Sequence, residues 1–74
     1  MERKSRGQEI ADTVQAALYK KDRSAAWLED ATKLSRSTID RILAGKAQRP
    51  NRATLATIYD ALGVPAASRV GVLP

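Results

Sequence analysis

Two serines that lie eleven residues apart, Ser24 and Ser35, each precede a short run of residues with helical hydrophobic spacing. Serine is a strong N-cap residue because its side-chain oxygen accepts a hydrogen bond from a free amide in the first helical turn. The first run predicts a helix over residues 24–32, and the second predicts a helix that begins at Ser35 and ends at Gly45. Only residues 33 and 34 remain between them. The chain must therefore turn sharply between two short helices.

A further helix is predicted on each side of this pair. Apolar residues recur at three- and four-residue spacing between Ile10 and Leu18, which predicts a helix from residue 7 or 8 to residue 20. Asn51 caps a last helix that stops at Gly63. No segment has a convincing strand pattern, because residues 70–73, the one stretch that could extend, contain a glycine. We therefore expect an all-α fold.

The composition excludes several classes of function. The chain of 74 residues is one small domain with no cysteine and no histidine, so it lacks disulfides, thiolate metal sites and the commonest general base. The adjacent acids Glu29 and Asp30 point in different directions around one helix, so they do not form a catalytic pair. No nucleophile lies beside a base. We expect no enzyme activity, cofactor or metal.

No apolar run could span a bilayer and no secretory signal precedes the domain, so we expect a cytoplasmic protein that does not enter a membrane.

The positive charge is concentrated in one part of the chain. The formal net charge is +5, and residues 36–52 hold five basic residues against one acid, Asp40. This excess favours an anionic partner, either nucleic acid or an acidic membrane surface. Short, individually capped helices with few exposed large apolar residues argue against the membrane surface. A sharp turn followed by a basic, exposed helix is the helix-turn-helix arrangement.

One spacing pattern runs through most of the chain: Leu28, Leu34-Ser35, Ile39, Ile42, Gly45-Lys46, Arg49-Pro50, Leu55 and Leu62-Gly63-Val64. In this pattern the sequence resembles the Cro/C1-type (XRE) helix-turn-helix family of phage repressors, antitoxins and small bacterial regulators. The resemblance implies a compact bundle of four to five helices, a lambda-repressor-like DNA-binding domain. It further implies a sequence-specific transcriptional regulator, most often a repressor, whose partner is double-stranded DNA. The alternative is a protein-interaction module on the same fold. The cationic helix argues against this alternative.

Three residues depart from the family pattern. Glu29 replaces a small residue, Lys33 replaces the usual glycine of the turn, and Leu43 replaces a frequent glutamate. Glu29 and Lys33 are four residues apart in a favourable order, so we interpret them as a compensating ion pair. A positive φ at Lys33 would strain the backbone, because a side chain disfavours that region.

The base-reading residues are expected on the helix Arg36–Ala44. Ile39 and Ile42 define its inner face, so at 100° per residue the opposite face carries Ser37, Arg41 and Ala44, flanked by Arg36, Thr38 and Asp40. Arginine can donate to both guanine acceptors, and serine can donate or accept. Since the family reads bases from the matching positions, we assign base contacts to Arg36, Ser37 and Arg41. Asp40 either accepts from a cytosine amine or orients Arg36, and we favour orientation. Thr38 and Ala44 are secondary candidates.

Phosphate contacts require charge and free backbone amides rather than a precise side-chain shape. Lys46, Arg49 and Arg52 would supply the charge. The helix N-termini at Ser24-Ala25 and at Asn51 would supply the amides. The alternative for this loop is a plain solvated segment. Arg3, Lys4 and Arg6 could form an arm along the duplex, or belong to a disordered terminus.

The boundaries that follow are a flexible basic arm over residues 1–7, the DNA-binding domain over residues 8–64, and a tail or linker over residues 65–74. Two stoichiometries stay open: a homodimer on a palindromic site, or a monomer. The chain could also be the N-terminal piece of a protein with a C-terminal domain.

Trp27 is expected to be partly buried rather than stacked on a base. Tyr59 and Leu43 are expected in the core.

Overall fold

A computed structural model describes residues 5–71 of the chain. Its helices are α1 (Arg6–Lys20), α2 (Ala25–Thr32), α3 (Arg36–Leu43) and α4 (Arg52–Leu62), followed by a 3₁₀ turn at Ala66–Ser68. Residues 5–71 contain no strand, so the predicted all-α fold is confirmed. No helix in this range is long and apolar enough to cross a membrane.

The capping residues begin the helices as the sequence predicts. The Ser24 side chain accepts from the Trp27 amide, and the Ser35 side chain accepts from the Thr38 amide. The side chain of Asn51 accepts from two amides in the first turn of α4. These hydrogen bonds satisfy donors that a helix start otherwise leaves free, and they fix where each helix begins.

Helix α1 begins at Arg6, earlier than the predicted residue 7 or 8. The reason is a cap at Ser5, whose Oγ accepts from the Gln8 amide at 3.1 Å. Arg6, one of the three residues expected in the N-terminal arm, therefore lies in the first helical turn. The other two, Arg3 and Lys4, lie outside the described residues.

Positive φ angles at Gly45 and Lys33 shape the ends of the two helices of the central pair, α3 and α2. Gly45 adopts φ +76° and closes α3, with the Lys46 amide donating to the Arg41 carbonyl at 3.1 Å. This is a Schellman ending, which favours glycine because a side chain disfavours positive φ. Lys33 ends α2 with φ +60°, so the suspected strain is present. The chain leaves the helical path at Lys33, which redirects its side chain.

The expectation of an ion pair between Glu29 and Lys33 is wrong. Lys33 Nζ lies 3.6 Å from Asp30 Oδ1, and Glu29 Oε2 lies 3.9 Å from Nη1 of Arg36. The left-handed backbone at Lys33 is the cause, because four-residue pairing requires both residues to follow one regular helix. Glu29 instead faces α3 across the turn.

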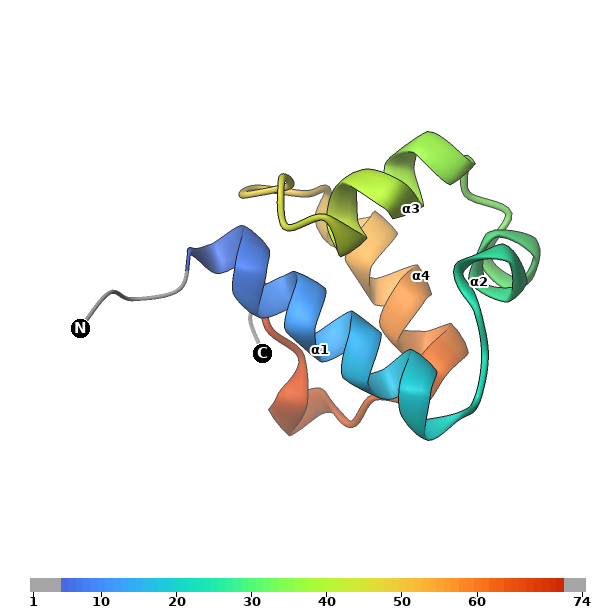
Figure 1. Ribbon diagram of the computed structural model, residues 1–74. Coiled ribbons are helices and arrows are strands. Elements are labelled where there is room, and N and C mark those ends of the chain that lie inside the picture. Colours follow the sequence, from blue (N-terminus) through green and yellow to red (C-terminus); the bar gives the residue numbers. More distant parts are fainter. Residues whose placement is uncertain (1–4, 72–74) are drawn as a thin grey trace.

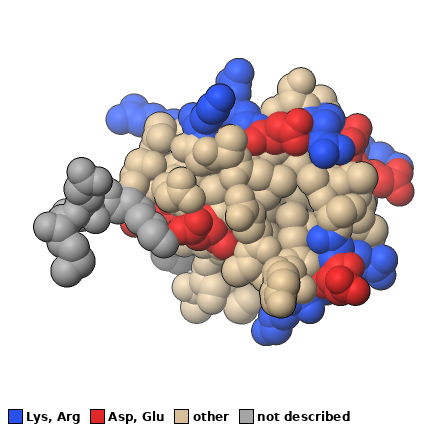
Figure 2. Space-filling view, in the orientation of Figure 1, with Lys and Arg blue, Asp and Glu red and all other residues tan. Residues whose placement is uncertain are grey.

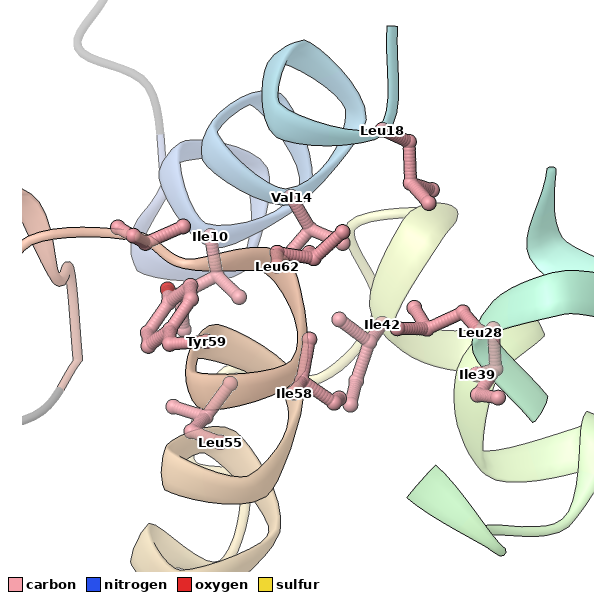
Figure 3. Close-up of a cluster of buried hydrophobic side chains, with 11 residues drawn as sticks. Ile10, Val14, Leu18, Leu28, Ile39, Ile42, Leu55, Ile58, Tyr59 and Leu62 are labelled. Carbon is pink, nitrogen blue, oxygen red and sulfur yellow. The ribbon is translucent and has the colours of Figure 1, made fainter. Parts of the chain in front are cut away.

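The four helices enclose one hydrophobic core. Helices α1 and α2 each pack against α3 and α4, and α4 runs through the middle of the bundle (Figure 1). Figure 3 shows the buried side chains that meet there, from Ile10 and Val14 on α1 to Ile58 and Tyr59 on α4. Tyr59 is fully buried, while Leu43 and Trp27 are partly buried against this cluster. The expected placements of these three residues are confirmed, with Leu43 at the edge of the core.

Residues 65–71 fold back beneath α1 (Figure 1). Tyr59 Oη donates to the Val70 carbonyl at 2.7 Å, and Arg69 Nε donates to the Val64 carbonyl at 2.9 Å. Arg69 also pairs with Asp60 at 2.7 Å. A Cβ on Gly71 would lie 3.0 Å from side-chain atoms of Ile10 and Leu55. The segment therefore packs onto the core that α1 and α4 share.

The Tyr59→Phe variant is expected to lose about 1 kcal/mol of unfolding free energy, because the Val70 carbonyl loses its donor. Burial raises the pKa of the Tyr59 hydroxyl, and the nearby Arg69 charge opposes this shift. The folded state thus keeps its proton where the unfolded chain begins to lose it, so this stability is present below about pH 10 and falls above it. Urea unfolding from about pH 8 to about pH 11 should show a steeper loss in the wild type. Parallel pH profiles with equal midpoints would contradict this contact.

Candidate nucleic-acid interface

A cleft of about 450 Å³ lies between the outer side of α3, the loop that follows it, and the start of α4. We refer to it as the α3 cleft. Its lining residues are Ser37, Thr38, Arg41, Ile42, Lys46, Ala47, Arg49, Pro50, Asn51 and Thr54. The cleft brings two predicted base-reading residues, Ser37 and Arg41, together with three predicted phosphate-binding residues from the loop. Residues separated along the sequence thus share one concave, basic surface.

The basic residues in and beside the α3 cleft are free to meet an anion. Arg41, Lys46, Arg49 and Arg52 are exposed, and none forms an ion pair with another residue in the range 5–71. Figure 2 shows basic side chains along the upper edge of the molecule, over α3 and the loop after it. Unpaired charges that converge on one side attract a polyanion and add to one another's potential.

Arg36 is placed differently from the other predicted base-reading residues. Its Nε donates to Asp40 Oδ1 at 2.9 Å, and its Nη1 lies 3.9 Å from Glu29 Oε2. The hydrogen bond to Asp40, followed by that carboxylate's charge, raises the pKa of Arg36. The favoured interpretation of Asp40, a contact that orients Arg36, has the predicted geometry. Because all three side chains are partly exposed, water screens these pairs and they add little stability.

The remaining candidates are spread around the α3 cleft. Thr38 lines it, but its hydroxyl is hydrogen-bonded to Ser35 Oγ at 2.9 Å. Ala44 and Arg52 are exposed beside it and do not line it. Ser24 and Ala25 begin α2 outside the cleft, and Ala25 is half-buried against the core. The start of α2 therefore presents its backbone amides and the exposed Ser24 hydroxyl.

Helix α1 positions the basic loop through Gly7 and Gln15, a role that sequence reasoning missed. The Gly7 amide donates to Gln48 Oε1 at 3.0 Å, and Gln48 Nε2 donates to the Gly45 carbonyl at 3.3 Å. Gln15 Nε2 donates to the Leu43 carbonyl at 2.7 Å. A Cβ on Gly7 would lie 2.5 Å from the Gly45 carbonyl oxygen, so only glycine permits this approach. These contacts hold the end of α3 and its loop against α1.

This geometry is that of a helix-turn-helix protein: a short helix, a sharp turn and a second helix whose outer face is basic and exposed. A family model described as a helix-turn-helix domain matches residues 3–70. The chain belongs to this helix-turn-helix family, which is of the XRE/Cro-like class and is typically DNA-binding and non-enzymatic. A search of curated proteins and a search of solved structures gave no significant match.

Proposed function

We propose that this chain is a sequence-specific transcriptional regulator that binds double-stranded DNA with α3 in the major groove. We further propose that it acts as a repressor, of the phage repressor, Cro-like or antitoxin type. The observation that carries the DNA-binding proposal is the α3 cleft, where Ser37 and Arg41 lie beside unpaired cations of the following loop. The major groove admits a helix and offers a distinct pattern of donors and acceptors for each base pair.

The proposed roles divide between bases and backbone. Ser37 and Arg41 read bases directly, and Arg36 reads a base while Asp40 holds it. Lys46, Arg49 and Arg52 contact phosphates, assisted by the backbone amides at the starts of α2 and α4. Phosphate contacts set the register of the protein on the duplex, and base contacts give the sequence preference.

Binding to duplex DNA should depend strongly on salt. If about four to six phosphates are neutralised, log K should fall with log salt at a slope of about −4 to −5 for each domain. Titration of a mixed-sequence duplex at several salt concentrations measures this slope. Sites selected from a random-sequence duplex pool then report base preference, and the length and symmetry of the footprint report stoichiometry. A slope near zero would contradict DNA binding and favour a protein-interaction module.

Replacing Arg49 or Arg52 with alanine should weaken binding to preferred and mixed-sequence duplexes by similar factors. Each substitution should reduce the salt slope by about one, because each removes one phosphate contact. Lys20→Ala is the matched control, since Lys20 is an exposed cation at the far end of α1. A change in base preference with an unaltered slope would contradict the assignment of these arginines to the backbone.

A further inference from the structure

Arg36 and Asp40 form one donor–acceptor unit on the exposed first turns of α3. Arg36 Nε is bound to Asp40 Oδ1, while Nη1 faces Glu29 on α2. Within residues 5–71, Arg36 Nη2 and Asp40 Oδ2 make no hydrogen bond. The pair therefore presents free N–H donors and a free carboxylate oxygen side by side. Arg41, one residue further, has no such acidic partner within the same range.

This arrangement matches one base pair better than the others. In the major groove, guanine offers the acceptors N7 and O6, and its partner cytosine offers an amino donor. A guanidinium beside a carboxylate supplies the complementary donors and acceptor. An A·T pair places the thymine O4 acceptor where the carboxylate would lie, and two acceptors repel each other. The carboxylate thus adds a penalty against wrong pairs as well as a contact to the right one.

The local charge supports selection rather than general attraction. Together Glu29, Arg36 and Asp40 carry one net negative charge at neutral pH, although Arg36 and Asp40 share α3 with Ser37 and Arg41 of the α3 cleft. Duplex DNA carries a negative charge about every 1.7 Å along its axis, so these carboxylates weaken binding to any sequence. Asp40 places a negative charge on the proposed contact face of α3, and a specific base contact would offset the cost of that charge.

We propose that Arg36 and Asp40 read one G·C base pair as a unit, with Arg36 on the guanine and Asp40 on the cytosine amine. Glu29 limits the movement of the guanidinium from the α2 side. This inference rests on the proposed DNA-binding function and specifies which base pair the first turns of α3 select.

The experiment compares sites selected from a random duplex pool by the wild type and by Asp40→Ala. Asp30→Ala is the matched control, because Asp30 is also an exposed helical aspartate with a basic neighbour, Lys33 at 3.6 Å. In the wild type, one G·C position should be preferred by about 5-fold to about 150-fold over other pairs. Asp40→Ala should remove most of that preference at this position alone, while its affinity for mixed-sequence DNA stays equal or rises. Asp30→Ala should keep the preference.

A double-variant cycle tests whether the two residues act together. Arg36→Ala should lose the preference at the same base pair, and the double variant Arg36→Ala with Asp40→Ala should lose no more preference there than either single variant. If Asp40→Ala selects the same sites as Asp30→Ala, or weakens all duplexes by one factor, the inference is overturned and DNA binding stands. If the wild type binds no duplex, the proposed function itself has failed. Melting temperatures of all variants confirm that each protein remains folded.

Discussion

Replacing Ile39 with alanine is expected to remove most of the stability of this domain. Ile39 is fully buried, and it lies on the inner face of α3 beside Leu28 of α2 (Figure 3). Truncating such a side chain costs about 2–5 kcal/mol, from lost burial and from the cavity left behind. A domain of this size has only about 3–5 kcal/mol in total. Because the same residue joins the two helices of the motif, its loss should disorder the DNA-facing surface together with the core.

Thermal and urea unfolding followed by circular dichroism measure this effect. Arg41→Ala is the matched control, because Arg41 lies two residues along the same helix and is exposed. The control should unfold near the wild-type midpoint, and Ile39→Ala should be largely unfolded at room temperature or melt far lower. Leu28→Ala should behave like Ile39→Ala. An Ile39→Ala protein that melts near the wild type would mean that α2 and α3 do not pack as described.

The second large effect is expected at Arg41, on DNA recognition rather than on stability. Arg41 lines the α3 cleft about one turn beyond Ser37, and it has no ion-pair partner within residues 5–71. Its planar fork can donate to both guanine acceptors, and a good bidentate contact gives about 1–3 kcal/mol of discrimination. Arg41→Ala should therefore lose affinity for the preferred site and relax the preference at one base pair.

Arg41→Lys separates charge from geometry. Lysine restores the positive charge and should recover much of the non-specific binding, but it lacks the planar fork and should recover only part of the selectivity. The measurement is a binding series with all four base pairs at each position of the selected site, for the wild type and both variants. If Arg41→Ala lowers every affinity by one factor, Arg41 is a phosphate contact and base reading falls to Arg36 and Ser37.

Features that depend on neighbouring residues were predictable from the sequence. The caps at Ser24, Ser35 and Asn51 involve amides two or three residues away. The contact between Arg36 and Asp40 follows from helical four-residue spacing. The earlier start of α1 had a local signal too, because Ser5 and Gln8 have the serine–glutamine spacing of a capping box. The outer face of α3 could be predicted for the same reason, since Ile39 and Ile42 fix the inner one.

Features that depend on distant residues were not predictable. Gly7 and Gln48 are 41 positions apart in the sequence, and neither residue type predicts that the two form a hydrogen bond. The packing of Gly71 between Ile10 and Leu55 depends likewise on the completed bundle. The prediction of a Glu29–Lys33 ion pair was wrong because it assumed regular helical geometry as far as Lys33, whose φ is positive. Spacing rules hold only where the backbone keeps its regular geometry, and turns are where it does not.

The central claim is that the outer face of α3 lies against DNA, and directed cleavage tests it directly. Because the chain has no cysteine, a single Ala44→Cys substitution at the exposed end of α3 can carry an iron chelate that cleaves nearby DNA. Tyr19→Cys is the control, since Tyr19 is 89% exposed and lies in the last turn of α1. The labelled Ala44→Cys protein should cut inside its own footprint on a selected duplex, and the Tyr19→Cys protein should not. Cleavage from Tyr19→Cys with none from Ala44→Cys would contradict the claim.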